Sequence, residues 1–139
     1  MQRVTLDTNV FISGLISRRG VCARLLALAE GGAFAIQLSE PIQNEVSTVL
    51  ARDFDLSEER VSQARTFLSS VSQHVTPHLE LNVVKRDPSD NRILECSQAS
   101  KSQYIVTSDK DLLSLGVHEG ATIIKPSEYL AVMLQDRSE

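Results

Sequence analysis

Two aspartates follow stretches of sequence that favour buried β-strands. Asp7 comes directly after Arg3–Leu6, and Asp109 comes shortly after Tyr104–Thr107. Both stretches contain the β-branched or aromatic residues that are typical of strands. Ligands bind beside the carboxyl ends of the strands in parallel sheets, so we expect both carboxylates at that edge.

Two further acids are expected to reach the same edge from helices. Asp90 lies in the first turn of a helix predicted to begin at Pro88, with Asp87 as its acidic cap. Glu45 lies in the second turn of a helix that starts after Ser39, beside the apolar stripe of that helix. A carboxylate next to a buried face is costly without a cation or a hydrogen-bond donor.

Each of these acids, taken alone, also has a simple structural interpretation. Asp7 suits a turn, whereas Asp90 and Asp111 suit the first turns of helices, where acids complement the helix dipole. Asp109 suits the same role behind Ser108 as the cap. Glu45 fits this interpretation less well, because the dipole effect has faded beyond the first turn.

Four carboxylates at one sheet edge would repel one another. At about 5 Å each pair costs roughly 3 kcal/mol at an effective dielectric near 20. A site built only from oxygen ligands favours Mg²⁺ or Mn²⁺ over zinc. Such ions activate water and stabilise the leaving oxygen of a phosphodiester, so the pattern predicts metal-dependent hydrolysis.

The rest of the chain alternates between short apolar runs and amphipathic stretches. We expect strands at Phe34–Leu38 and Ala121–Ile124, and helices at Val10–Leu15, Val21–Glu30, 57–72 and Pro126–Gln135. Leu81–Val84 is either a strand or an extended approach to the next helix. This alternation predicts an α/β fold, with a parallel sheet of about four or five strands flanked by helices, in a single domain over residues 1–139.

The composition fits an ordinary soluble domain and excludes several classes of protein. The 139 residues are 42% hydrophobic and 23% charged, which argues against intrinsic disorder. The net charge of −4 at first argues against a nucleic-acid partner. Setting aside the four candidate ligands, however, leaves 14 of the 18 acids against 14 Lys and Arg. The acidity then belongs to the site, and nucleic-acid binding should depend on metal.

The location is predicted from features that the sequence lacks. Cys22 and Cys96 are far apart and suggest neither a disulfide framework nor a zinc site. Asp7 and Asn9 interrupt the N-terminal apolar stretch, which argues against a signal peptide. No run of about 18 apolar residues is present, as a membrane span would need. We therefore expect a cytoplasmic protein without a membrane partner.

The motifs around the four acids resemble those of the PIN-domain ribonucleases, particularly the VapC-like toxins of bacterial toxin–antitoxin systems. The similar stretches, in order, are LDTNVFIS (6–13), SEPIQNEV (39–46), RDPSDNRIL (86–94), IVTSDKDLL (105–113) and IKPSEYL (124–130). They span essentially the whole chain. One departure is Ser108, which stands where the family often has glycine.

The resemblance implies a three-layer PIN-like fold and an endoribonuclease that requires Mg²⁺ or Mn²⁺. By this resemblance Asp7, Glu45, Asp90 and Asp109 are the catalytic, metal-binding acids. The supporting polar residues that it implies are Thr8, Asn9, Ser108 and Asp111. Asp87 and Asp111 are adjacent alternatives to Asp90 and Asp109, which align better with the acids of the family. It also implies an RNA substrate, a cognate antitoxin protein that covers the active site, and a homodimer.

Basic residues near these motifs are candidates for contacts with RNA phosphates. Arg86 and Arg92 flank the third acidic motif, and Lys110 lies in the fourth. A role as solvated surface charges explains them equally well.

Other functions explain the pattern less completely. A haloacid-dehalogenase-like phosphatase needs a second Asp two positions after the first, where this chain has Asn9. A phosphoacceptor receiver domain needs an acidic pair before its acceptor and a late lysine, for which Lys125 is a weak candidate. A non-catalytic PIN scaffold that only binds a partner would have little reason to keep four repelling acids.

Overall fold

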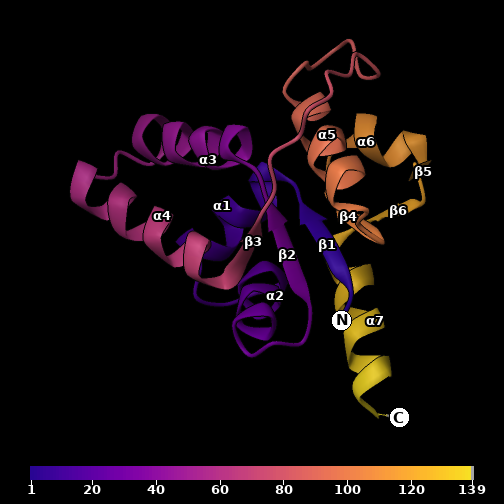
Figure 1. Cartoon of the computed structure of the whole chain (residues 1–139). Helices are drawn as coiled ribbons and strands as arrows, with labels where there is room; N and C mark the ends of the chain where they lie inside the picture. Colours follow the sequence, from indigo (N-terminus) through magenta and orange to yellow (C-terminus); the bar gives the residue numbers. More distant parts are fainter. Residues whose placement is uncertain (139) are drawn as a thin grey trace.

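This computed structural model describes residues 1–138, and the side chains of residues 1–135. Six strands in these residues form one sheet. They are β1 (Arg3–Leu6), β2 (Ala35–Leu38), β3 (Ser72–His74), β4 (Tyr104–Val106), β5 (Val117–His118) and β6 (Ala121–Ile124). Their order is β3-β2-β1-β4-β6-β5 (Figure 1). All are parallel except β5, which pairs antiparallel with β6. The carboxyl ends of β1 and β4 therefore lie side by side.

The predicted parallel sheet is confirmed, and the structure adds two edge strands that the sequence pattern did not predict. β3 consists of Ser72, Gln73 and His74, and β5 has two residues, so neither shows an apolar alternation. Residues 81–84, predicted as a strand or an extended approach, lie outside the sheet.

Seven helices accompany the sheet in the described part of the chain. They are α1 (Thr8–Ile16), α2 (Val21–Glu30), α3 (Glu40–Asp53), α4 (Glu58–Val71), α5 (Asp90–Ser100), α6 (Lys110–Leu115) and α7 (Pro126–Ser138). None of the helices within residues 1–138 combines the length and the apolar character needed to cross a membrane.

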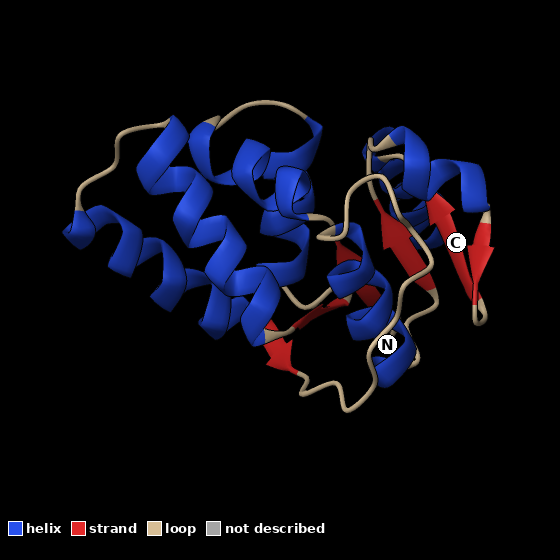
Figure 2. Ribbon diagram, turned by 90° about the horizontal axis from the view of Figure 1, so that it is seen from above, coloured by secondary structure: helices blue, strands red, loops and turns tan. Residues whose placement is uncertain are grey.

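The helices cover both faces of the sheet, as Figure 2 shows. The Thr5 hydroxyl is 2.8 Å from that of Ser102, just after α5, and α5 packs against β1, β2 and β4. Val4 points to the opposite face because side chains alternate along a strand. Its neighbour Tyr104 contacts the ring of Tyr129 in α7 on that face. The three-layer architecture follows from these two contacts.

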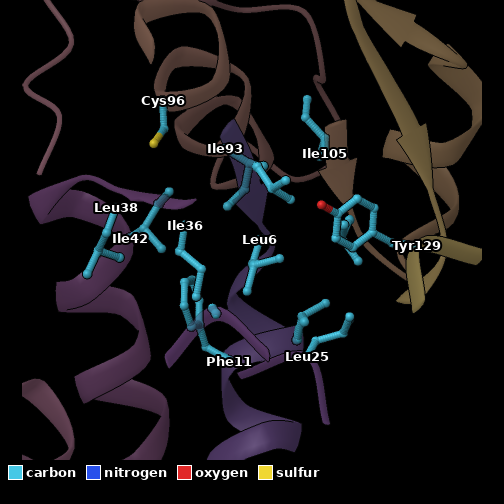
Figure 3. Packing of buried hydrophobic residues seen from close by; sticks show 14 of the residues in the cluster. Leu6, Phe11, Leu25, Ile36, Leu38, Ile42, Ile93, Cys96, Ile105 and Tyr129 are labelled. Atoms are coloured by element: carbon cyan, nitrogen blue, oxygen red, sulfur yellow. The ribbon is translucent and has the colours of Figure 1, made fainter. Parts of the chain in front are cut away.

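The core lies on both faces, and α2 packs against both α1 and α7. In Figure 3, Ile93 and Cys96 of α5 lie above Leu6 of β1, whereas Phe11 and Leu25 lie below it. Leu6 and Leu38, the last residues of β1 and β2, are fully buried. Phe34 and Tyr129 meet edge to face with ring centroids 5.1 Å apart. Each buried side chain of this kind contributes about 1.5–3 kcal/mol of transfer free energy. The strand ends that precede the candidate acids are thus fixed by the core.

The start of α5 differs from the prediction. The helix begins at Asp90 rather than at Pro88, and Asp87 accepts hydrogen bonds from the backbone N–H and hydroxyl of Ser89. These bonds make a turn of residues 87–89, which delays the helix. Ser39 occupies the predicted cap position of α3, but its side chain makes no capping hydrogen bond.

Candidate active site

The acids that follow β1 and β4 lie at neighbouring strand ends. Asp7 precedes α1, and its backbone N–H donates to the Val106 carbonyl at 3.0 Å. Asp109 precedes α6, and its Oδ2 accepts from the Leu112 N–H at 2.9 Å. Asp109, not Ser108, is therefore the cap of α6. The capping bond also fixes the orientation of the Asp109 carboxylate.

The hydroxyl of Thr107 joins these two acids. Thr107 Oγ1 donates to Asp7 Oδ2 at 2.6 Å and accepts from the Asp109 N–H at 2.9 Å. The side chain is fully buried. Because the hydroxyl uses its only proton on Asp7, it supports the ionised form of that carboxyl group.

Glu45 reaches the cluster from α3, which packs against α1. The Thr8 hydroxyl donates to Glu45 Oε2 at 3.3 Å. Thr8 is buried next to Asp7, whereas Glu45 is half-buried. This contact places the glutamate beside the end of β1, and the neighbouring α1–α3 packing fixes its approach.

The environment of Asp7 makes ionisation costly. Burial raises the pKa of its carboxyl group from 3.8 to about 6, against hydrogen bonds from Thr107 and the Thr8 backbone that lower the pKa. The charges of Asp109 and Glu45 raise the pKa further. Two of the other predicted acids thus act electrostatically on Asp7.

Asp90, the first residue of α5, is the most strongly perturbed acid of the cluster. Its side chain is buried, and Oδ2 has no hydrogen-bond partner among the described residues. Burial raises its pKa to about 8, and the facing carboxyl of Asp109 and the charges of Asp7 and Asp87 add to the shift. A buried carboxylate oxygen without a donor indicates a missing cation or proton.

The donor set fits a divalent cation bound through oxygen. One carboxylate oxygen from each of Asp90, Asp109 and Asp111 can lie within 4.8 Å of the others. Asp7 and Glu45 are not members of this trio. The charge of Asp7 acts on Asp90, whereas Glu45 is connected to the cluster only through Asp7 and Thr8. Hard cations such as Mg²⁺ and Mn²⁺ prefer this kind of site. Asp111, predicted as a supporting residue, is therefore also placed to act as a ligand.

A cavity of about 650 Å³ opens beside the acids. It is lined by Asn9, Arg86, Asp87, Ser108, Asp109, Lys110 and Asp111. The predicted supporting residues Asn9 and Ser108 thus line the cavity together with three acids and two cations. A phosphodiester fits such a place, because the cations can bind phosphate oxygens next to the acidic cluster.

Comparison with known proteins identifies the family of this arrangement. Residues 3–111, which include all four predicted acids, match the PIN domain. The chain belongs to the PIN-domain family. It is 35% identical over 117 residues to an uncharacterized protein of Methanocaldococcus jannaschii, a match that covers 81% of this chain and 74% of that protein.

A solved structure shares the PIN fold seen here. A chain in the crystal structure of VapBC2 from Rickettsia felis, bound to a DNA fragment from their promoter, superposes with a TM-score of 0.63. The match covers 89% of this chain and 98% of the other at 12% sequence identity. The architecture expected from the resemblance, helices around a mainly parallel sheet, is therefore confirmed.

The three residues predicted to contact phosphate lie at two different places in the PIN domain. Arg86 and Lys110 line the cavity. Arg92 instead forms a salt bridge with the buried carboxylate of Glu95, with both nitrogen–oxygen distances at 2.7 Å. Of the three predicted phosphate contacts, only Arg86 and Lys110 are therefore found at the cavity.

Two polar residues near the site of this PIN domain were missed in the sequence. The sequence pattern predicts Thr107 only as the end of a strand, yet its hydroxyl connects Asp7 and Asp109. Asn91 was not assigned a role, yet its amide is buried next to Asp90. The sequence does contain a signal for Thr107, because it is a polar residue that ends an apolar strand two positions before Asp109.

Proposed function

We propose that this PIN domain is a divalent-metal-dependent endoribonuclease, the toxin of a toxin–antitoxin pair. The observation that carries the proposal is the acidic cluster around two buried aspartates, in which Asp90 Oδ2 lacks a partner among the described residues and Asp7 and Asp90 have raised pKa values. Such a cluster suits a cation better than it suits water or empty space.

Asp7, Glu45, Asp90 and Asp109 would hold the ion, and Asp111 is a further candidate ligand because its carboxylate lies close to those of Asp90 and Asp109. A bound Mg²⁺ or Mn²⁺ supplies Lewis acidity, which activates water and stabilises negative charge on the leaving oxygen of a phosphodiester. Thr107 keeps Asp7 ionised and oriented toward the site through its hydrogen bond. In the metal-free protein near neutral pH, Asp90 holds a proton that it must release before its carboxylate can face a cation.

The remaining residues orient the substrate and the attacking water. We assign the positioning of water to Glu45 of α3 or Asp90 of α5. Arg86 and Lys110 bind phosphate oxygens of the RNA at the rim of the cavity. Asn9, Ser108 and Thr8 supply polar surface and support around the acids.

The direct test is cleavage of single-stranded RNA, structured RNA and DNA of the same sequence, with Mg²⁺ or Mn²⁺. We expect cleavage of RNA that falls by about a hundredfold or more in Asp7→Asn and in Asp90→Asn, because each removes a metal ligand. Asp55→Asn is the matched control, since Asp55 is exposed and already has the positive φ of 52° that asparagine tolerates. Wild-type rates in both site variants would refute the metal assignment.

The solved VapBC2 complex supports the proposal that this chain also has a protein partner. We expect a small DNA-binding protein to be encoded beside it, to bind this chain and to block RNA cleavage in the cytoplasm. Growth arrest on expression of this chain, relieved by the neighbouring protein or by Asp90→Asn, tests the toxin role. Equal growth with and without expression would contradict that role.

We also propose that the chain forms a homodimer. In α7, Met133 is buried in the core, whereas Leu134 is 45% exposed and borders a shallow groove with Leu28 of α2. Sedimentation equilibrium of wild type and Leu134→Glu measures the assembly directly. A monomer at micromolar concentration would contradict the dimer.

A further inference from the structure

The segment that connects β3 to α5 lacks helix and strand structure over residues 75–89. Unstructured connections of this length are uncommon inside compact domains and are usually functional or disordered. Here the segment rises from β3 and runs beside α5 (Figure 1). It carries Arg86 and Asp87, which line the cavity next to the acids.

The amide of Asn91 holds this segment against α5. Its Oδ1 accepts from the backbone N–H groups of Val83 and Val84, both at 2.9 Å. Its Nδ2 donates to the carbonyls of Val84 at 2.7 Å and Pro88 at 3.2 Å. The side chain is 1% exposed, and these four bonds use both donors and both lone pairs of the amide.

A second attachment lies one turn further along α5. The carboxylate of Glu95 accepts from the Leu81 N–H at 2.8 Å and is held by the guanidinium of Arg92. Glu95 is 6% exposed, so this bond is shielded from water. The second attachment fixes the approach of the segment, whereas the bonds of Asn91 to Val84 and Pro88 enclose residues 85–87.

We propose that Asn91 is a positioning residue for substrate binding, which acts through Arg86. This inference rests on the proposed nuclease function. Asp90 and Asn91 are consecutive in α5, so their side chains leave the helix about 100° apart. The first turn of α5 therefore fixes both Asp90 and the segment that carries Arg86. The four bonds of Asn91 fix the position of Arg86 relative to the acids of the site. Arg86 binds one phosphate of the substrate, and the acids act on the neighbouring phosphate.

The test is a double-mutant cycle on Arg86→Gln and Asn91→Leu, with KM and kcat measured on a single-stranded RNA. We expect Arg86→Gln to raise KM about tenfold, because a charge-assisted contact is lost. Asn91→Leu should raise KM by a similar factor and leave kcat within about threefold of the wild-type value. The KM of the double variant should exceed that of wild type by no more than about tenfold. Multiplication of the two effects to about a hundredfold would overturn the proposal.

Two further variants separate positioning from general loss of structure. Gln43→Leu is a matched control, because this buried amide likewise donates twice, to Arg65 O and Ser69 Oγ between α3 and α4. It should lower stability without raising KM. Asn91→Asp keeps the acceptor for Val83 and Val84 but loses both donated bonds, so its KM should lie between wild type and Asn91→Leu. A KM increase in Gln43→Leu equal to that in Asn91→Leu would contradict a specific role.

Amide hydrogen exchange tests the attachment even if the chain does not cleave RNA. Absence of RNA cleavage and binding by the wild type would remove the nuclease function, whereas the exchange rates report only on the segment. We expect the amides of Val83 and Val84 to be protected in wild type and in Gln43→Leu, and to lose protection in Asn91→Leu. Unchanged protection in Asn91→Leu would overturn the positioning role.

Discussion

Thr107 Oγ1 donates a hydrogen bond of 2.6 Å to Asp7 Oδ2, and so connects the ends of two neighbouring strands. The same oxygen accepts from the N–H of Asp109, the acid that caps α6. One buried hydroxyl therefore orients one acid of the site directly and the backbone of another. Burial raises the pKa of Asp7 to about 6, and the hydrogen bond from Thr107 opposes this increase.

Replacing Thr107 by the isosteric valine should weaken metal binding. The hydrogen bond from Thr107 lowers the pKa of Asp7, so its loss raises that pKa above about 6 and favours the protonated form. We expect the Mn²⁺ affinity at neutral pH to fall about tenfold in Thr107→Val, and to recover in part at higher pH. Calorimetric titration across pH measures both effects, and a pH-independent loss would count against the role of the hydroxyl.

The metal-free protein should lose stability as pH rises. The pKa values of Asp7 and Asp90 are raised from 3.8 to about 6 and about 8 in the folded state, so folding favours their protonated forms. Their stabilising contribution is complete below pH 3.8 and is lost as pH rises through these two values. In EDTA the Tm of Asp90→Asn should exceed that of wild type by about 5 °C near pH 8, and the difference should shrink near pH 6. A lower Tm for Asp90→Asn near pH 8 would contradict this electrostatic cost.

Metal should stabilise the protein more strongly at higher pH. A cation competes with the protons on Asp7 and Asp90, so its affinity increases between about pH 6 and pH 8. We therefore expect the Tm increase caused by millimolar Mn²⁺ or Mg²⁺ to be larger near pH 8 than near pH 6. Differential scanning calorimetry measures the shift. No shift at either pH would favour a PIN scaffold that binds a partner without metal.

The salt dependence of RNA binding should distinguish Arg86 and Lys110 from Arg92. Removing one phosphate contact lowers the slope of log K against log salt by about 0.7 for a single strand. Arg86→Gln and Lys110→Gln should each show this reduction, because both residues line the cavity. Arg92→Gln should leave the slope unchanged and lower the Tm instead, because it leaves the buried carboxylate of Glu95 without its cation. If only Arg92→Gln changed the slope, Arg92 rather than Arg86 or Lys110 would be the phosphate contact.

The sequence predicted those elements whose patterns are strong and local. The bounds of β1, α2 and β6 agree with the structure because apolar periodicity and clear stop signals define them. β3 was missed because its residues are polar and its pairing with β2 supplies the only reason for a strand there. The delayed start of α5 reflects the side chain of Asp87, which bonds to Ser89 rather than to a helical N–H.

The site was predictable to the extent that it depends on strand ends. Asp7 and Asp109 could be brought together from the rule that parallel strands end at one edge. The hydrogen bond of Thr107 could not, because it depends on the register that pairs Leu6 with Val106. The bonds of Asn91 and the bond from the Leu81 N–H to Glu95 could not, because they depend on the path of residues 75–89, which no periodic pattern specifies. The salt bridge between Arg92 and Glu95 joins residues three apart in α5, a spacing that the sequence does contain.

Binding of Mn²⁺ near pH 8, measured by isothermal titration calorimetry in buffers of different ionisation enthalpy, tests the metal centre most directly. The buried acids predict saturable binding that releases protons, because Asp90 has a pKa of about 8 and must ionise to bind the ion. Asp90→Asn should abolish both the binding and the proton release, whereas Asp55→Asn should retain them. Absence of binding at millimolar Mn²⁺, or equal binding by wild type and Asp90→Asn, would contradict a metal centre at these acids.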